Sequence, residues 1–359
     1  MKILVLSGDG IGPEITQATL DVLGAVDAQL SLGLEFECMD IGFASLAAVG
    51  STCPEDVMQR IPQVAGVILG PVSHAEYPSR NQGGINPSGA IRVTFELGAN
   101  IRPCRSRPGL SILRMPMDLI IVRECTEGFY ADRNMHAGLP EFMPDEHTAL
   151  SVRKISSRAC RRVAHAAFQL ARERRRKVTA VHKANVLKMS DGLFLREVRD
   201  VARDYPDITL DDLLVDSTAA LLVRTPDRFD VIVTTNMFGD ILSDEASELC
   251  GGIGLAGSIN AGDAICVAQA QHGSAPDIAG KNIANPTSLI LSAAMLLAWR
   301  GRRDGNDRLI AAATLIEHSI DRVIDDPACR TRDLGGTVGT DAFARSVVRL
   351  IASGVPAPC

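Results

Sequence analysis

The 359-residue chain lacks the sequence features of several protein classes. Aromatic residues make up only 4% of it, with a single tryptophan, and its nine cysteines include no CxxC pair. The cysteines therefore show none of the spacing typical of zinc sites, and their odd number argues against a disulfide framework. We expect free thiols in a reducing compartment.

A basic charge excess and a long apolar run are also missing. Lysine and arginine total 37 against 43 acidic residues, a net charge of -6, which argues against nucleic-acid binding. The basic run at 172–177 is interpreted as a solvated helix face, with a nucleic-acid patch as the alternative. The longest apolar stretch, 289–299, is too short to span a bilayer. The start, MKILVLSGDGIG, is typical of a first strand rather than a signal peptide, so we expect a cytoplasmic protein with no membrane partner.

The pattern that is present indicates an α/β protein. Short runs rich in valine and isoleucine alternate with helical patterns, which predicts a substantially parallel sheet in one large domain or two closely joined domains. Residues 131–150 break this rhythm and are interpreted as an insertion or an arm that could contact a partner. The predicted strands are KILVLS, AGVILG, LIIVRE, KVTAVHKAN, LLVDS and DVIVTTN.

The segment GDGIGPE, residues 8–14, follows the first strand and opens a helix. It does not match the Rossmann fingerprint, because the third glycine of GxGxxG would fall at Pro13. Proline suits the first helical position and Glu14 suits the helix dipole, so a helix is expected to begin here. The segment is either a tight turn or a phosphate loop of another kind.

Two aspartates indicate a metal site. Asp240 and Asp244 lie one helical turn apart in TTNMFGDILSDEAS, and like charges so placed repel unless a cation neutralises them. Mg2+ and Mn2+ prefer a few carboxylates completed by water or substrate oxygens. Asp216, which ends the apolar run LLVD, is a candidate third ligand. Each aspartate taken alone is equally compatible with a helix cap or a dipole partner.

Three arginines and a tyrosine–lysine pair are further candidates. Arg92, Arg102 and Arg123 could together bind a substrate with two or three carboxylates, although isolated arginines are usually surface residues. Tyr130 and Lys183 could transfer protons if neighbouring charges shift their pKa values. The alternative is that Tyr130 packs in the core and Lys183 extends to solvent.

A loop rich in glycine and proline, HGSAPDIAGKNIANP at 272–286, leads into a helix with Asn285 as the expected cap. Such a loop could close over a nucleotide, with Asp277 accepting hydrogen bonds from ribose hydroxyls.

Taken in order, these segments closely resemble the β-decarboxylating dehydrogenases, the family of isocitrate, 3-isopropylmalate, homoisocitrate and tartrate dehydrogenases. The resemblance runs from GDGIGPE to TRDLGGTVGTDAF and so covers almost the whole chain. Its most specific segments are ANIRP, IVRECTEGFY, HKANVLKMSDGLF, VIVTTNMFGDILSDEAS and HGSAPDIAGKNIANP.

The resemblance implies a two-domain fold with a twisted mixed sheet, different from the Rossmann fold. Residues 1–99 and 253–359 would form the nucleotide-binding domain, and residues 100–252 the substrate and dimerisation domain with its arm near 131–150. The family works as homodimers with shared active sites, in which Lys183 and Asp216 would reach the site of the other subunit.

The resemblance also assigns roles. Metal-assisted oxidation by NAD and decarboxylation of a 3-substituted malate are implied, with Lys183 removing the hydroxyl proton and Tyr130 protonating the enol. The negative charge of Asp277 favours NAD over NADP. The implied substrate-binding residues are Ser88, Arg92, Arg102 and Arg123; the metal ligands are Asp216, Asp240 and Asp244, for Mg2+ or Mn2+; and the cofactor-binding residues are His272, Gly273, Ser274, Ala275, Asp277 and Asn285.

The sequence departs from the family pattern at four positions in three segments. Gln269 stands where many relatives have glutamate, and Cys125 where many have asparagine. Ser88 and Gly89 make a small, mildly polar surface where isopropylmalate enzymes usually have leucines, isocitrate enzymes a serine and asparagine, and homoisocitrate enzymes an arginine. An isopropyl group would lose about 1–3 kcal/mol there relative to a fitted apolar pocket.

Two other functions compete with this prediction. A non-catalytic regulatory subunit of a hetero-oligomeric relative is disfavoured, because every position implied in catalysis is retained. A phosphate-ester dehydrogenase would be expected to use histidine ligands, and none of the seven histidines lies near Asp240 in the sequence.

Overall fold

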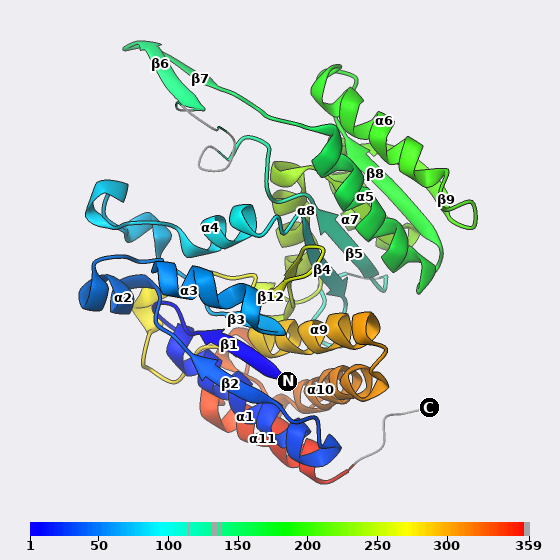
Figure 1. Cartoon of the computed structure of the whole chain (residues 1–359). Coiled ribbons are helices and arrows are strands. Elements are labelled where there is room, and N and C mark those ends of the chain that lie inside the picture. The colour runs from blue at the N-terminus through cyan, green and yellow to red at the C-terminus, as the bar shows by residue number, and fades with distance from the viewer. Residues whose placement is uncertain (114, 131–134, 136–137, 139, 355–359) are drawn as a thin grey trace.

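The computed structural model describes residues 1–113, 115–130, 135, 138 and 140–354. A ten-stranded sheet runs through the molecule in the order β2-β1-β3-β12-β11-β4-β5-β10-β8-β9 (Figure 1). The strands are β1 (Lys2–Leu6), β2 (Glu35–Cys38), β3 (Gly66–Leu69), β4 (Ala99–Arg105), β5 (Asp118–Arg123), β8 (Lys177–His182), β9 (Thr209–Leu214), β10 (Val231–Thr234), β11 (Ile259–Ala261) and β12 (Cys266–Gln269).

The sheet consists of two parallel blocks that run in opposite directions. Strands β2, β1, β3 and β12 are parallel to one another, and so are β5, β10, β8 and β9. Antiparallel pairing of β11 with β12 and β4, and of β4 with β5, joins the blocks. The predicted mixed sheet, distinct from a Rossmann fold, is confirmed. The proposed division into two domains remains a prediction.

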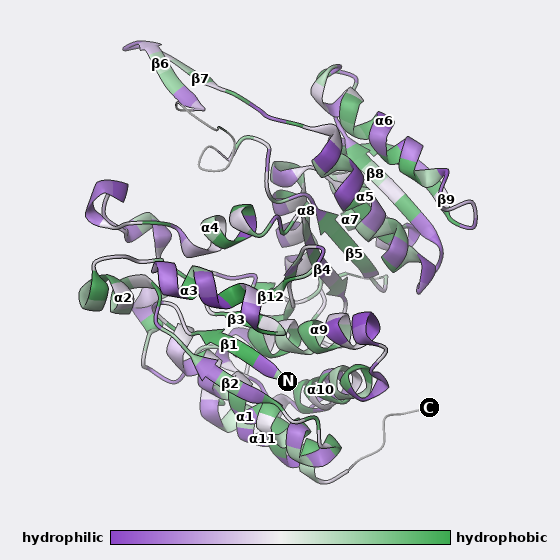
Figure 2. Cartoon of the chain, viewed as in Figure 1, coloured by the Kyte–Doolittle hydropathy of each residue, from purple (hydrophilic) through white to green (hydrophobic). Residues whose placement is uncertain are grey.

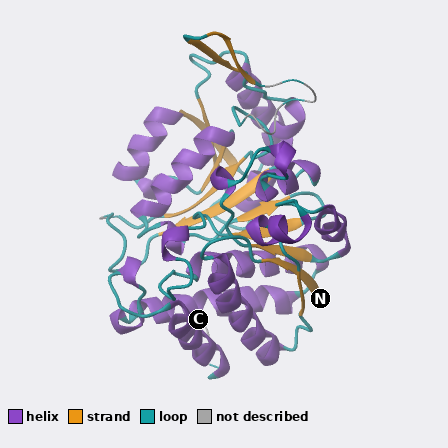
Figure 3. Cartoon of the chain, turned by 90° about the vertical axis from the view of Figure 1, so that its left-hand side faces the viewer, coloured by secondary structure: helices purple, strands orange, loops and turns teal. Residues whose placement is uncertain are grey.

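Helices lie on both sides of this sheet (Figure 3). None of those in the described part of the chain combines the length and apolar character that crossing a membrane requires. They are α1 (Gly12–Leu30), α2 (Gly42–Val49), α3 (Glu55–Arg60), α4 (Pro87–Thr94), α5 (Ser157–Arg172), α6 (Ser190–Ala202), α7 (Val215–Arg224), α8 (Asn236–Leu249), α9 (Thr287–Asp304), α10 (Asp307–Asp325) and α11 (Thr340–Ala352).

Two helix starts test the sequence signals. Helix α1 begins as expected, with Pro13 and Glu14 in its first turn. Helix α9 begins at Thr287 with Pro286 at the cap position, one residue later than predicted. The Asn285 side chain still accepts a hydrogen bond from the Thr287 amide at 3.0 Å, which explains why the residue has the character of a cap.

The hydrophobic core is divided by the sheet. Side chains alternate across each strand, so Ile120 and Val122 of β5 join a large cluster with α1, α5, α6, α9, α10 and α11 on one face. On the other face, Leu119 and Ile121 join a cluster with α7 and α8, and Leu4 and Leu6 of β1 join a third with α3 and α4. Figure 2 shows β5 as strongly hydrophobic.

A two-stranded hairpin stands apart from the large sheet (Figures 1 and 3). It pairs β6 (Glu141–Asp145) with β7 (Thr148–Ser151) and exposes the large apolar side chains Phe142, Met143 and Leu150. This hairpin falls within the predicted arm, of which residues 131–134, 136–137 and 139 lie outside the described part of the chain. The role of the arm in partner contact stays a prediction.

Candidate active site

A polar strip separates the two smaller hydrophobic clusters. Where the neighbouring strands place apolar side chains on this face, β11 and β4 place Asn260, Asn100 and Arg102, and β5 ends with Arg123. All four residues are buried. Buried polar groups require partners. Helix α8 supplies partners for both arginines, Ser258 pairs with Asn100, and Gln269, the last residue of β12, pairs with Asn260.

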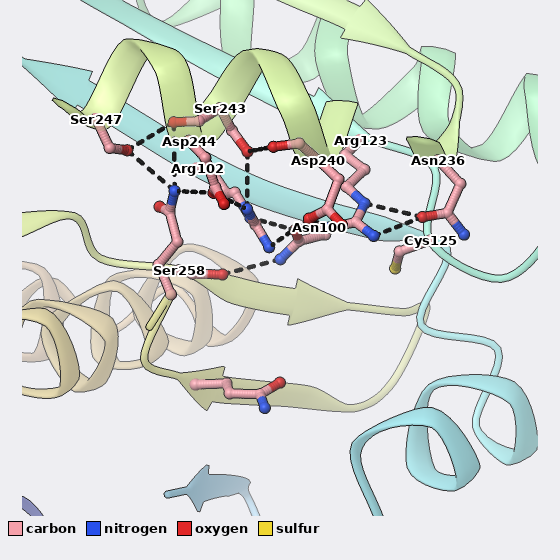
Figure 4. A network of polar contacts seen from close by, with 12 residues as sticks. Asn100, Arg102, Arg123, Cys125, Asn236, Asp240, Ser243, Asp244, Ser247 and Ser258 are labelled. Carbon is pink, nitrogen blue, oxygen red and sulfur yellow. Dashed lines mark hydrogen bonds and ion pairs between the residues drawn. The ribbon is translucent and has the colours of Figure 1, made fainter. Parts of the chain in front are cut away.

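Helix α8 supplies the opposing charges. Arg102 pairs with two of the three predicted metal ligands, with its Nη1 3.0 Å from Asp244 Oδ1 and its Nη2 3.5 Å from Asp240 Oδ1. Arg123 forms an ion pair with Asp240 through Nη1. Figure 4 shows both guanidinium groups directed at these two aspartates. The one-turn spacing read from the sequence therefore places Asp240 and Asp244 above the same pair of arginines.

A glycine allows the helix to lie this close to the strand. A Cβ added at Gly239 would lie 2.6 Å from Cβ of Arg123, closer than real carbon contacts. Asn236, in the first turn of α8, accepts hydrogen bonds from Arg123 Nε at 2.9 Å and from Nη2 at 2.7 Å. The guanidinium of Arg123 is thus held by two residues of α8, one turn apart.

The charge cluster keeps Asp240 ionised. Burial alone would raise the pKa of Asp240, but the cations Arg123 and Arg102 and a hydrogen bond from Tyr130 outweigh it and hold the pKa below its usual value. The Tyr130 hydroxyl donates to Asp240 Oδ2 at 2.5 Å, and the Arg123 guanidinium lies 5.5 Å from the tyrosine ring centroid. Tyr130 therefore belongs to the polar cluster rather than to the apolar core.

Helix α4 lies on another side of this polar cluster, and its side chains form hydrogen bonds to Gln269, the last residue of β12. One amide oxygen, Gln269 Oε1, accepts hydrogen bonds from Ser88 Oγ at 3.0 Å, Arg92 Nη2 at 3.1 Å and Asn260 Nδ2 at 3.3 Å. Asn86 caps α4 by accepting from the Gly89 amide, which fixes the turn that carries Ser88. Two of the predicted substrate-binding residues thus converge on the glutamine noted as a departure.

These groups line a cleft of about 510 Å³. Its size is in the range typical of small-molecule sites. Two glutamines, Gln269 and Gln271, line it as well. No pattern in the sequence predicted the contacts of Gln271. Of the predicted site residues, the cleft brings together Ser88, Arg92, Arg102, Arg123, Tyr130, Asp240, His272 and Gly273.

Lys183 and Asp216 lie elsewhere. Lys183 follows β8 and Asp216 is in the first turn of α7, and they form an ion pair with 2.6 Å between Nζ and Oδ1. The hydrogen bond from Lys183 lowers the pKa of Asp216. Neither residue is among those that line the cleft. Across the described residues, no group of three His, Cys, Asp or Glu side chains could hold a metal ion within one chain.

The loop at 272–286 packs against the GDGIGPE segment. The Ile11 amide donates to the Ser274 carbonyl at 2.8 Å, and the Ser274 hydroxyl lies 2.8 Å from that of Ser73. Burial lowers the pKa of His272, which therefore favours its neutral form.

The other predicted cofactor residues differ in exposure along this loop. Asp277 is exposed, in a short turn that follows Ala275, whose backbone is left-handed with φ of 38°. The side-chain amide Nδ2 of Asn285 donates a hydrogen bond to Asp333 Oδ2 at 2.8 Å.

The two departures near the site have different surroundings. Gln269 is part of the cleft, whereas the buried thiol of Cys125 donates a hydrogen bond to the Leu97 carbonyl.

Arginines of the basic run at 172–177 are paired with acids: Arg172 with Asp207, and Arg174 with the buried Asp230.

Comparison with known proteins assigns the chain to a family. The family model described as isocitrate/isopropylmalate dehydrogenase matches residues 2–347. The chain belongs to this family. The resemblance read from the sequence is thereby confirmed.

Several members of the family resemble the chain along nearly its whole length. It is 42% identical to an isocitrate/homoisocitrate dehydrogenase of Thermus thermophilus, over 98% of this chain and 99% of the relative. It is 40% identical to a 3-isopropylmalate dehydrogenase of Methanothermobacter thermautotrophicus, over 97% and 98%. The crystal structure of an isocitrate dehydrogenase from Methylococcus capsulatus has a TM-score of 0.85 at 36% identity, covering 98% of this chain and 99% of that one.

Proposed function

We propose that the chain is an NAD-dependent and divalent-metal-dependent dehydrogenase that oxidises and decarboxylates a 3-substituted malate. The observation that carries the proposal is the polar cleft lined by the buried Arg102 and Arg123 and by Asp240, with Asp244 of the same helix paired to Arg102 beside it. Buried cations are costly unless they are paired, and a small dianionic substrate with a cation suits such a site.

The substrate carboxylates would be bound by arginine. Arg92, Arg102 and Arg123 all line the same cleft and come from a helix and two strands, so they approach a ligand from different directions. The guanidinium group binds carboxylates through paired hydrogen bonds. Arg102 and Arg123 have little freedom, because each is buried and already held by α8.

The aspartates fit a hard divalent cation. Their oxygens are the donors that Mg2+ and Mn2+ prefer, and both side chains are partly exposed, 33% for Asp240 and 55% for Asp244. Asp216 of a second copy would be the third ligand. When bound, the metal would supply Lewis acidity that polarises the substrate hydroxyl and stabilises the enolate.

Two residues would move protons. Lys183, from the second copy, would take the proton of the substrate hydroxyl during oxidation. The Tyr130 hydroxyl, fixed by its hydrogen bond to Asp240, would donate a proton to the substrate carbon after loss of carbon dioxide. The returning proton would come from solvent.

Exposed apolar side chains support a homodimer. Val186 and Met189 follow Lys183 and are 65% and 88% exposed, while Val223 on α7 and Ile241 on α8 are 54% and 60% exposed. Val223 and Ile241 lie on the two helices that carry Asp216 and Asp240, and these helices pack together. Apolar groups gathered in this way are typical of a protein interface.

The loop at 272–286 would hold NAD, which would accept hydride from the substrate. His272 and Gly273 would lie toward the nicotinamide because they line the cleft. Ser274, Ala275, Asp277 and Asn285 continue away from it along the loop. The negative charge of Asp277 would repel a 2'-phosphate and so favour NAD over NADP.

The malate substituent would contact the small polar surface at Ser88. That surface gives an isopropyl group little apolar contact, and the relatives act by name on isocitrate, homoisocitrate and 3-isopropylmalate. We therefore place the preference on a substituent with a polar end.

A substrate screen tests the proposal. Reduction of NAD would be followed with Mn2+ or Mg2+ against D-malate, tartrate, isocitrate, 3-isopropylmalate and homoisocitrate. We expect turnover with one of the substrates that carry a polar substituent, and loss of that turnover after chelation. Absence of turnover with all five would overturn the function, and equal kcat/KM with NADP would overturn the cofactor assignment.

A further inference from the structure

Gln271 connects the end of β12 to the helix that carries the acidic pair. Its backbone amide donates to Ser288 Oγ on α9 at 3.1 Å, which fixes the main chain. Its side-chain Nε2 reaches α8, with Asp244 Oδ1 at 2.7 Å, Ser247 Oγ at 3.0 Å and the Ser243 carbonyl at 3.3 Å.

The partners determine which way the amide faces. The carboxylate of Asp244 and the carbonyl of Ser243 can only accept hydrogen bonds, so the nitrogen of Gln271 must face α8 and its oxygen must face away. That oxygen, Oε1, is buried and has no hydrogen-bond partner within the described part of the chain. A buried acceptor without a partner is unfavourable, so folding stability alone does not explain a glutamine here.

The contacts orient the carboxylate of Asp244. Arg102 Nη1 and Gln271 Nε2 both donate to Oδ1, at 3.0 and 2.7 Å. Among the described residues, no hydrogen bond or ion pair to Asp244 Oδ2 is present, although the side chain is 55% exposed. One oxygen is therefore held by two donors, and the other has no protein partner among the described residues and can ligate a cation.

The neutral charge of the glutamine matters as much as its position. A second cation beside Arg102 would compete with a metal ion for the charge of Asp244, whereas an amide holds the oxygen without adding positive charge. Donors to the oxygens of a ligating carboxylate commonly tune metal affinity in this way.

We propose that Gln271 is a positioning residue for the divalent metal, because it fixes Asp244 Oδ1 and leaves Oδ2 turned toward the cation. This inference rests on the proposed role of Asp244 as a metal ligand. It also predicts that the metal affinity of the pair Asp240 and Asp244 depends on Gln271, a residue outside that pair.

The test is a Mn2+ titration of the full-length protein, with free Mn2+ measured by electron paramagnetic resonance. Gln271→Leu and Gln271→Met keep the size of the side chain and remove the donor, so we expect the Kd for Mn2+ to rise about tenfold. The thermal unfolding midpoint without metal should not fall, because the unpaired buried oxygen is removed as well.

Gln17→Leu is the matched control. Gln17 Nε2 also donates to an aspartate, Asp21 Oδ1 at 2.8 Å, but on the exposed surface of α1. This variant should bind Mn2+ as the wild type does. An unchanged Kd in both Gln271 variants, or an equal rise in the control, would overturn the inference.

Asp244→Asn separates the two proposals. If it weakens Mn2+ binding while the Gln271 variants do not, the metal site stands and the positioning role fails. If Mn2+ binding survives Asp244→Asn unchanged, the assignment of Asp244 fails and the role of Gln271 fails with it.

Discussion

Two acid–cation pairs of this chain carry the same proposed chemistry in opposite surroundings. Asp240 lies against Arg102 and Arg123, whose side chains are only 7% and 3% exposed. Asp216 pairs with Lys183 near the surface, and its side chain is 62% exposed. The first pair is held on several sides by the fold, while the second depends on a single contact.

The difference agrees with the proposal that one chain contains only part of the site. The inner cluster is buried and closely paired, whereas the outer pair is exposed and would meet the inner cluster of a second copy. Loss of one partner of a buried pair destabilises the fold, because the other charge stays buried without it, whereas an exposed pair contributes little in water. The two pairs should therefore respond differently to the same substitution.

The largest expected effect is that of Asp240→Asn. It removes a proposed metal ligand and leaves two buried arginines without this carboxylate, so kcat should fall about 10³-fold and the free energy of unfolding by about 3 kcal/mol. Steady-state kinetics and denaturant unfolding measure the two effects. Asp216→Asn should reduce kcat as well but leave unfolding unchanged. Equal destabilisation by both variants would contradict the comparison.

The next effect depends on two copies sharing a site. Lys183→Met and Asp240→Asn should each be nearly inactive alone, yet a mixture unfolded and refolded together should recover about a quarter of wild-type activity, because half of the dimers would be mixed and each would have one intact site. Activity would be measured before and after mixing. A mixture that stays inactive, although mixed dimers are detected, would mean that each site is built from one chain.

A smaller effect is expected at the substrate wall. Gln269→Glu places a carboxylate against Arg92 and should weaken the grip of this arginine on a substrate carboxylate, raising KM about tenfold with a smaller change in kcat. Gln269→Met, which cannot accept these hydrogen bonds, is the comparison that separates added charge from lost positioning. A KM that falls in the glutamate variant would show that Arg92 does not bind the substrate.

The smallest effect is a dependence of folding stability on pH, which we expect from the imidazole of His272 rather than from either acid–cation pair. The pKa of His272 is lowered by burial from 6.5, so the unfolded chain takes up the proton first as the pH falls. The stabilising contribution is present above about pH 6.5 and is lost as the pH falls toward the folded pKa. Denaturant unfolding at several pH values should show this loss in the wild type and not in His272→Gln.

Much of this arrangement could be predicted from the sequence. The i, i+4 spacing of Asp240 and Asp244 placed both on one face of a helix. The Val- and Ile-rich runs located β1, β3, β5, β8 and β10, whereas the predicted strand LLVDS was wrong beyond Leu214, where α7 begins. Arg102 and Arg123 were found as candidates because arginine suits the forked binding of carboxylates.

Other features could not be derived in this way. Gln271 contacts Asp244, 27 residues away, and no local pattern identifies such a contact. Asn100 is a different case, because it was not singled out although the sequence allowed it. It lies two residues before Arg102, so strand alternation predicts that both side chains lie on the same face of β4. The predicted cap at Asn285 was wrong by one residue because its side chain accepts from Thr287 across a proline.

The polar strip on the floor of the cleft also determines what kind of force can hold a ligand. A ligand there meets guanidinium, carboxylate and amide groups, with the apolar clusters set to either side, so hydrophobic burial contributes little to its affinity. Its binding free energy must come from charge pairing, which dissolved ions weaken by screening. Affinity at this site should therefore be governed by ionic strength far more than it would be in an apolar pocket of the same volume.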